Sequence, residues 1–348
     1  MEIAASYLYG IFPCKMKLIV ETGNFSRRVA HVKLNMDLTR EFMIRQVRAI
    51  LRRNGYKLSS ELSMSSSYDI IGSRGNEIII VKVLYNVDTL KPEIASEMKL
   101  LSNILKAKAI IIGAKCGIGP LEDSILYSRY GIPVFSIKTF SDFINADQYP
   151  IGFAAPGGFY VKINSKLLKE TREKMGISLG ELAKVANVSR RSIQLYEEGQ
   201  TAVSIDVIMK IEDYLNVNLI DTVDPFQNPP EIEEKDKFSF PRDNFDREIE
   251  ELFKKMGSFV YFVRKSNVDG LSNMDDILFL GFSKMRENLM DKVRTIEEIA
   301  AITEKYGLVF TELKDLDKDL PIINLKEIEK KDNETVRNII LEKRFRSY

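Results

Sequence analysis

The stretch SKLLKETREKMGISLGELAKVANVSRRSIQLYEEGQTAVSIDVIMKIEDYLNV, residues 165–217, decides the fold of the central part of this chain. Its apolar residues recur every three or four positions, the spacing of one face of a helix, in four successive segments. Helix-start signals separate the segments: Ser178 with Glu181 forms a capping-box pair, and Ser189 and Ser204 precede the third and fourth segments. The pattern predicts a bundle of four short helices around Leu167, Leu168, Met175, Leu179, Leu182, Ala183, Val185, Ile193, Tyr196, Ile205, Ile208, Ile211 and Leu215.

The second and third segments, residues 179–197, have the features of two helices joined by a tight turn. Ala183 is small, as a residue must be where two crossing helices approach closely. Asn187 lies at the turn, where the backbone needs a residue that tolerates positive φ. Gly199 follows the third segment and is expected to end it in the left-handed conformation. These residues predict a helix-turn-helix.

Polar side chains gather on the exposed N-terminal half of the third segment, the part of such a motif that meets base edges in DNA. Arginine can bond in bidentate fashion to guanine and glutamine to adenine, and either can hold a phosphate. We therefore predict base contacts from Arg190, Arg191 and Gln194. The full predicted DNA-binding set is Ser178, Leu179, Lys184, Ser189, Arg190, Arg191, Ser192, Gln194 and Leu195, with Ser178, Lys184, Ser189 and Ser192 near phosphates.

Residues 178–199, SLGELAKVANVSRRSIQLYEEG, and the amphipathic helix after them resemble the helix-turn-helix of the Cro and lambda-repressor (XRE-like) family. The resemblance covers about sixty residues and implies double-stranded DNA as a partner. Two positions depart from it. Leu179 stands where many members carry a polar, phosphate-contacting residue, and Asn187 replaces the usual glycine.

A helical bundle can also serve only as a protein-interaction module, with its arginines solvated. The local charge favours a polyanion instead: residues 162–200 hold eight basic and five acidic residues, a balance of +3 against +1 for the whole chain.

Composition bounds the rest of the chain. Its 348 residues are enough for two or three domains, and 45% hydrophobic with 29% charged residues is ordinary for globular cores. Cys14 and Cys116 fit neither a zinc site nor a disulfide framework, which favours a reducing cytoplasm. The single histidine, His31, excludes histidine-based triads and histidine-rich metal sites. No apolar run reaches membrane-spanning length, so no membrane partner is expected.

Residues before the bundle alternate between helix and strand in the order expected of an α/β domain. The expected elements are helix 39–54, strand 68–72, a turn at 74–76, strand 77–84, helix 92–106, strand 109–113, a short helix, strand 133–137 and helix 139–144. The glycines at 113–120 follow a strand without the spacing of a nucleotide-binding loop, so a plain strand-to-helix turn is expected, with a small-ligand site as the alternative.

This order resembles the core of the restriction-endonuclease-like, PD-(D/E)xK nuclease fold. Asp69 and Lys82 match the first aspartate and the lysine of that motif, but Ile80 stands at the acidic position and cannot ligate a hard cation. Glu77 lies on the opposite face of the strand from Lys82. We therefore predict a nuclease-like scaffold without an intact catalytic motif: no enzyme, no catalytic residue, no metal and no cofactor.

Residues 245–331 echo the first α/β domain, with a helix at 246–256, strands at 259–264 and 276–282, a helix at 295–306 and a strand at 308–313. The echo has no acidic-x-Lys pair, because Leu280 and other apolar residues fill the strand. It is expected to serve packing or dimerisation. The predicted divisions are a poorly ordered leader (1–35, with the native start at Met36), a nuclease-like domain (36–146), a connection (147–163), the helix-turn-helix domain (164–222), a linker (223–244), a second α/β domain (245–331) and a charged C-terminal tail (332–348).

The predicted fold class is multidomain, α/β plus all-α, with a central lambda-repressor-like bundle flanked by restriction-endonuclease-like domains. This arrangement resembles a family of archaeal transcriptional regulators. It implies a sequence-specific DNA-binding regulator, expected as a homodimer on half-sites about 34 Å apart, with an unknown effector. A DNA-targeted nuclease using Asp69 and Lys82, and a protein-interaction adaptor, stay open as alternatives.

Overall fold

The computed structural model describes residues 40–60, 66–117, 119–227, 240–314, 317 and 319–346. The predicted leader, the start at Met36, Cys14 and His31 lie outside these residues. Within the described residues, no helix combines the length and the apolar character needed to cross a membrane.

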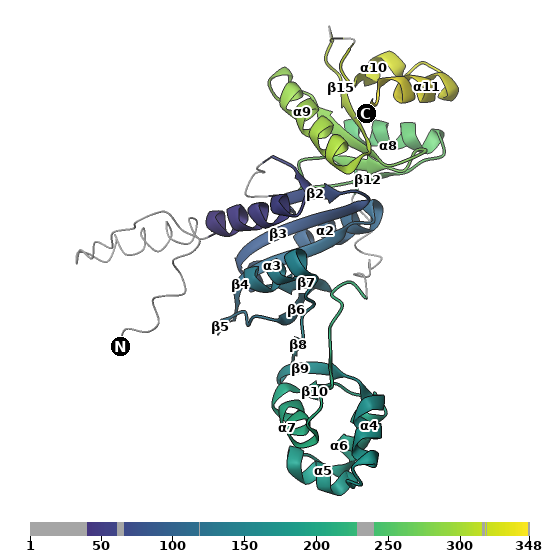
Figure 1. Cartoon of the computed structure of the whole chain (residues 1–348). Coiled ribbons are helices and arrows are strands. Elements are labelled where there is room, and N and C mark those ends of the chain that lie inside the picture. Colours follow the sequence, from purple (N-terminus) through teal and green to yellow (C-terminus); the bar gives the residue numbers. More distant parts are fainter. Residues whose placement is uncertain are drawn as a thin grey trace, which may run out of the picture. The chain divides into compact units, whose positions relative to one another are not determined.

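The first α/β part is built on a mixed sheet (Figure 1). Strands β1, β2 and β3 are antiparallel neighbours, and β3, β4 and β7 are parallel neighbours, in the order β1-β2-β3-β4-β7. The elements are a helix at residues 40–53, β1 (Lys57–Leu58), β2 (Ile70–Arg74), β3 (Glu77–Asn86), the 3₁₀ helix η1 (Val87–Thr89), α2 (Pro92–Leu105), β4 (Lys108–Cys116), β5 (Gly119–Pro120), β6 (Ile125–Arg129), β7 (Ile132–Phe135) and α3 (Ile137–Ala146).

The two faces of this sheet are covered by different helices, because successive side chains of a strand point to opposite sides. Ile78 and Ile80 of β3 pack in the cluster that contains α2. Ile79 and Val81 pack in the cluster that contains the helix of residues 40–53 and α3. The apolar run of β3 is therefore buried on both faces, as expected for a central strand beside a parallel neighbour.

The short helix expected between residues 113 and 133 is wrong. Residues 125–129 form strand β6, which pairs antiparallel with β7. Tyr130 and Gly131 join the two strands, and both have left-handed φ angles, 52° and 79°. A two-residue turn with both central residues at positive φ favours a hairpin, so the turn specifies the strand. The expected strand-to-helix turn at 113–120 is also wrong, because residues 113–116 continue β4 and residues 119–120 form β5.

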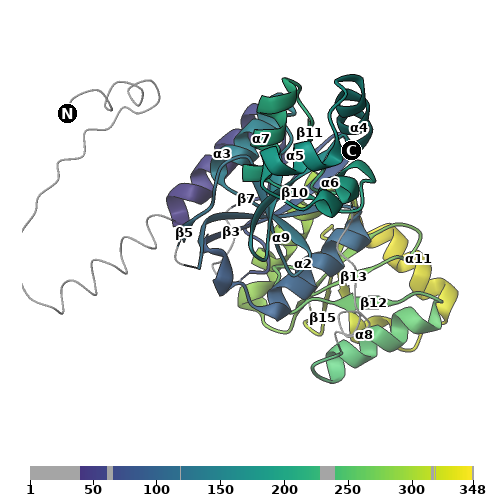
Figure 2. The same cartoon turned by 90° about the horizontal axis from the view of Figure 1, so that it is seen from below.

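The central part combines short strands with the predicted helical bundle (Figure 2). Strand β9 pairs antiparallel with β8, β10 and β11. The elements are β8 (Gly152–Ala155), β9 (Gly158–Ile163), α4 (Ser165–Lys174), α5 (Leu179–Ala186), α6 (Arg190–Glu197), β10 (Val203–Ser204), α7 (Ile205–Leu215) and β11 (Ile220–Asp221). The four predicted helices are confirmed, and their apolar faces share one core with Val161 of β9. Met175, which was expected in this core, is exposed. Strand β8 lies in the segment that we expected to be a connection, residues 147–163.

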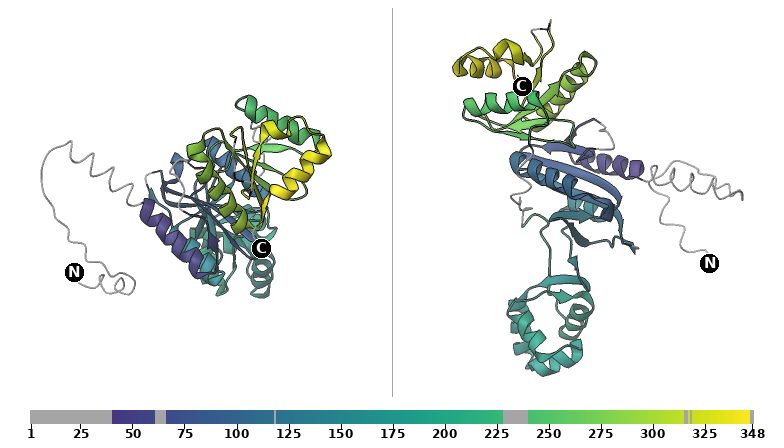
Figure 3. Two further views of the ribbon diagram at one scale, coloured as in Figure 1. Left: turned by 90° about the horizontal axis from the view of Figure 1, so that it is seen from above. Right: turned by 180° about the vertical axis from the view of Figure 1, so that it is seen from behind.

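The C-terminal part has a sheet in the order β12-β13-β14-β15-β16, with α9 on one face and α8, α10 and α11 on the other (Figure 3). Its elements are α8 (Asn244–Lys255), β12 (Val260–Phe262), β13 (Gly270–Ser272), β14 (Leu278–Ser283), α9 (Arg286–Thr303), β15 (Tyr306–Thr311), β16 (Ile322–Asn324), α10 (Leu325–Ile328), α11 (Asn333–Lys343) and β17 (Phe345–Arg346). The charged C-terminal segment, which the sequence suggests is a partly frayed helix, contains helix α11, with Val336 and Ile340 buried in the core.

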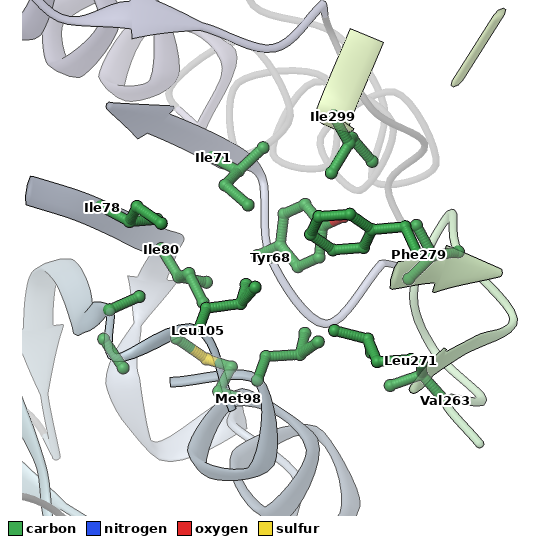
Figure 4. Packing of buried hydrophobic residues seen from close by; sticks show 14 of the residues in the cluster. Tyr68, Ile71, Ile78, Ile80, Met98, Leu105, Val263, Leu271, Phe279 and Ile299 are labelled. Atoms are coloured by element: carbon green, nitrogen blue, oxygen red, sulfur yellow. The ribbon is translucent and has the colours of Figure 1, made fainter. Parts of the chain in front are cut away.

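One hydrophobic cluster contains residues of both α/β sheets. Tyr68 and Ile71 of the first α/β part point toward Phe279 of β14 and Ile299 of α9 in the second (Figure 4). Tyr68 and Phe279 are each 1% exposed, so the contact is as fully buried from solvent as the core of a single domain. The second α/β part thus packs on the first through the faces that carry α2 and α9.

Candidate nucleic-acid interface

Helix α5 begins and ends as the sequence predicts. The Ser178 Oγ accepts a hydrogen bond from the Glu181 amide at 3.1 Å, so Ser178 is the N-cap. Asn187 ends the helix in the left-handed region, with φ 55° and ψ 47°. The Val188 amide then donates to the Ala183 carbonyl at 3.0 Å. This turn fixes the direction in which the chain enters α6.

Helix α6 presents its first turn to solvent. The Ser189 Oγ accepts from the Ser192 amide at 3.0 Å and lies 2.8 Å from the Ser192 hydroxyl. Ile193 and Tyr196 are buried in the core of the bundle, which orients the opposite face of the helix outward. Arg190 and Arg191 are exposed at the start of this helix. A capped helix start with two exposed guanidiniums can bind a polyanion.

The predicted contact residues fall on two neighbouring helices, α5 and α6, and differ in exposure. The exposed ones are Ser178, Lys184, Ser189, Arg190 and Arg191, and the half-buried ones are Leu179, Ser192, Gln194 and Leu195. Leu179 packs against the core of the bundle, so it contributes packing where family members place a polar group. The Gln194 Nε2 donates to the Glu198 Oε1 at 2.7 Å, so a base contact requires Gln194 to give up that bond.

An ion pair that the sequence interpretation missed fixes α6 on α4. The Arg172 Nη2 donates to the Glu197 Oε2 at 2.9 Å, while the Arg172 Nε donates to the other carboxylate oxygen. The Arg172 Nη1 also donates to the Ile177 carbonyl at 2.9 Å. The side chains of Arg172 and Glu197 are 10% and 7% exposed, so the pair is largely desolvated. One signal was present: Arg172 follows the buried Leu168 by four residues and thus lies on the apolar face of its helix.

The nuclease-like motif residues Asp69 and Lys82 do meet, but in a closed arrangement. The Asp69 Oδ1 accepts from Arg40 at 2.7 Å and from Lys82 Nζ at 3.2 Å, and the Oδ2 accepts from the Val83 amide at 2.7 Å. Lys82 Nζ also donates to the Ser66 carbonyl at 2.5 Å. Desolvation lowers the pKa of Lys82.

Ile80, at the acidic position of the motif, is fully buried in the core. Within the described ranges, no three His, Cys, Asp or Glu side chains are grouped closely enough to hold a metal ion. Both oxygens of Asp69 are therefore engaged by protein donors, and Ile80 provides no carboxylate beside it.

The glycine-containing segment after β4 has a packing role at its first glycine. A Cβ at Gly113 would collide with Val87 and lie 3.0 Å from Leu121. The close approach of these two side chains explains why the strand has glycine there. Since β5 pairs back on β4 at Lys115 and Cys116, the segment is a strand connection and not a phosphate-binding turn before a helix.

Comparison with known proteins identifies the two regions described above, the nuclease-like domain and the helix-turn-helix. A PD-(D/E)XK superfamily domain model matches residues 40–150, and a helix-turn-helix model matches residues 168–221. Relatives named as HTH-type transcriptional regulatory proteins, a name that specifies no operator, occur in several archaea. The one from Thermoplasma acidophilum is 32% identical, over 89% of this chain and 100% of its own. Those from Methanocaldococcus jannaschii (32% identical, 86% and 95%) and Archaeoglobus fulgidus (39% identical, 63% and 70%) are similar. No solved structure matches the chain.

Proposed function

Because the chain belongs to the archaeal family of HTH-type transcriptional regulatory proteins, we propose that it binds DNA sequence-specifically and regulates transcription, with α6 in the major groove. The observation that carries this proposal is the exposed start of α6. Arg190 and Arg191 stand there on a helix that is capped by Ser189. A rigid, capped helix loses little entropy when its side chains bind bases.

The positions of the side chains support the following roles in this proposal. Arg190 and Arg191 reach base edges, joined by Gln194 once it releases Glu198. Ser178, Ser189 and Ser192 lie at the starts of α5 and α6, where amides and the helix dipole favour phosphate, and Lys184 adds a positive charge. Leu179 and Leu195 supply apolar contact at the edge of this surface.

A single helix-turn-helix buries little surface, so we propose that two copies bind together, as a homodimer on half-sites about 34 Å apart. In this proposal the bundle is flanked in sequence by two nuclease-like α/β domains. The regulator acts where the chromosome lies, in the cytoplasm.

The decisive experiment compares Arg190→Ala/Arg191→Ala with a control variant, Lys210→Ala, which removes an exposed positive charge from α7. Genomic fragments selected by the native protein are the probe. We expect the double variant to lose specific retention of these fragments, since each bidentate base contact contributes roughly 1–3 kcal/mol of discrimination. The control should retain them. Unchanged retention by the double variant would refute the proposal.

The PD-(D/E)XK match favours a second candidate, a DNA-targeted nuclease. We rank it lower because Asp69 is engaged by Arg40, Lys82 and the Val83 amide, and Ile80 replaces the second carboxylate. Magnesium-dependent cleavage that disappears in Asp69→Ala would reverse this order. A protein-interaction adaptor, the third alternative, predicts no salt-dependent DNA affinity, whereas phosphate contacts make affinity fall steeply with salt.

A further inference from the structure

The two α/β sheets have the same strand order and the same strand directions. From β1 to β7 the neighbours are antiparallel, antiparallel, parallel and parallel. From β12 to β16 the neighbours follow the same series. The helices α2 and α9 both cross from the third strand to the fourth, and both end in a left-handed residue, Lys106 and Glu304. These matches align the two parts element by element.

Under this alignment Asp269 corresponds to Asp69, because both precede the second strand and make the same backbone contacts. The Asp69 amide donates to the Val81 carbonyl at 2.8 Å, and its Oδ2 accepts from the Val83 amide at 2.7 Å. The Asp269 amide donates to the Leu280 carbonyl at 2.9 Å, and its Oδ2 accepts from the Phe282 amide at 2.8 Å.

A lysine completes the correspondence, although it comes from a different element. Lys292 of α9 places its Nζ 2.8 Å from the Asp269 carboxylate and 3.2 Å from the Asn267 carbonyl. Lys82 of β3 makes similar contacts with Asp69 and with the Ser66 carbonyl, although Ser66 lies three residues before its aspartate and Asn267 lies two before Asp269. Each ammonium thus joins the aspartate to the loop that precedes it.

The strand position of Lys82 is occupied in the second sheet by Gly281. A Cβ at Gly281 would lie 2.8 Å from Lys292 Cγ and 2.9 Å from Ile296 Cγ1. Counted back from the left-handed caps, Lys292 corresponds to Ile94 and Ile296 to Met98. Lys292 therefore fills the space that the side chain of a lysine at position 281 would need. The second α/β part cannot hold a lysine at both positions in this arrangement.

The two loops held in this way are the ones through which the α/β parts dock. The Ser67 amide donates to the Lys265 carbonyl, next to the carbonyl of Ser66 that Lys82 binds. The Ser266 Oγ donates to the Tyr68 hydroxyl at 3.3 Å. We propose that Asp269 and Lys292 form the counterpart of the Asp69–Lys82 pair, and that the two pairs are positioning residues that hold the docking loops, residues 66–68 and 264–267.

The test is amide hydrogen exchange in the full chain carrying Lys292→Met. This change removes the ammonium from Asp269 and from Asn267, and we expect the amides of Ser67, Arg264 and Lys265 to exchange roughly tenfold faster. The control is Lys305→Met, which removes a lysine from an ion pair with Asp276 at the other end of β14. Amides of the docking loops should exchange at the native rate in the control.

A second variant moves the lysine back to the strand. Gly281→Lys with Lys292→Ile and Ile296→Met copies the set Lys82, Ile94 and Met98 into the second sheet, and we expect it to restore slow exchange in the docking loops. Native exchange in Lys292→Met would overturn the proposal. So would a folded transplant whose loops exchange as fast as those of Lys292→Met. If Lys292→Met does not fold, the transplant decides alone: protected loops support the proposal, and failure to fold refutes it.

Discussion

Asn187 holds the turn of the helix-turn-helix with a backbone angle that few residues tolerate, φ 55°. Glycine and asparagine adopt this left-handed region readily. For most other residues the conformation is about 1–2 kcal/mol less favourable, because the β-carbon lies too close to the backbone. We expect Asn187→Ala to destabilise the bundle by about 1 kcal/mol and Asn187→Gly to be within a few tenths of native, measured by exchange of the buried amides of α5 and α6. Asn218→Ala, at a position without positive φ, is the control; an equal loss there would contradict this account.

Tyr68 makes the junction of the α/β parts sensitive to alkaline pH. Burial raises its pKa to about 12, above the ordinary value of 10.0. The unfolded chain loses the phenolic proton first, so the stability from this group is complete below pH 10 and falls by about 2 kcal/mol toward pH 12. Burial lowers the pKa of Lys82, so its contribution to stability changes with pH in the direction opposite to that of Tyr68.

Comparing Tyr68→Phe with the native chain isolates the tyrosine, since Lys82 is common to both. The free energy of unfolding, from denaturant titrations between pH 9 and 12, should fall less in Tyr68→Phe. Tyr149→Phe, at a side chain that is 40% exposed, should follow the native curve. Parallel curves for Tyr68→Phe and the native chain would exclude this role.

Single residues with a local backbone requirement could be predicted from the sequence. Ser178, Ser189 and Asn187 each act within a few positions of the chain, and the structure confirms them as two N-caps and a left-handed turn. Arg172 and Glu197 could not be paired in this way, because they lie 25 positions apart and meet only when α4 packs on α6. Lys292 was missed for a different reason: the motif places its lysine on a strand and not on a helix.

The Arg172–Glu197 pair controls how α6 is held against α4. Removing one member of a desolvated pair leaves the other charge buried without its partner, which costs about 3–5 kcal/mol. We expect Arg172→Ala to destabilise the bundle by about 3 kcal/mol and to weaken DNA binding. Arg172→Lys should be intermediate, because an ammonium cannot bind both carboxylate oxygens in the planar geometry of arginine. The bundle's amide exchange and fragment retention measure the two effects.

Lys174→Ala is the matched control for this prediction, because Lys174 lies on the same helix with an exposed side chain. It should leave the stability of the bundle within about 0.5 kcal/mol of native. Equal effects of Arg172→Ala and Lys174→Ala would show that the ion pair does not brace the helix.

Helices with regular apolar spacing over several turns, or with a helix-start signal, were predicted well, and short strands were not. Helix α2 begins at Pro92, as expected of a proline in the first turn. Strands β8 and β13 have four and three residues, too few for an alternating pattern to stand out. Helix α9 begins at Arg286, nine residues before the expected start. This start was not predicted because its N-cap residue, Met285, makes no side-chain cap and so gives no start signal.

At the scale of the whole molecule, the sequence echo predicted a second α/β part but not how it packs. Met98 of α2 and Ile296 of α9 each have the spacing of an ordinary core residue, so nothing local indicates that both belong to one shared cluster. The echo was expected to serve packing or dimerisation. The structure shows the packing within one chain, so the proposed homodimer has to use other faces.

Glutamates from α2 and α9 reach across the junction in both directions. The Glu97 carboxylate accepts from the Arg264 amide at 2.6 Å and from the Lys265 amide at 2.9 Å. The Glu298 Oε1 accepts from the amide and the hydroxyl of Ser60, at 2.6 and 2.7 Å. Glu97 is buried whereas the Ser60–Glu298 contact is exposed, so the two links should differ in strength.

This difference gives a prediction for the full chain. Glu97→Gln keeps one acceptor oxygen but buries an amide group opposite two donors, which costs about 2 kcal/mol. Calorimetry should show the melting of the α/β parts lowered by about 4–8 °C. Glu298→Gln should lower it far less, because solvent replaces an exposed contact at little cost. Glu93→Gln, on the exposed side of α2, should melt like the native chain. A larger effect of Glu298→Gln than of Glu97→Gln would mean that the α/β parts are joined chiefly at Ser60, and that the buried amides of the 264–267 loop contribute little.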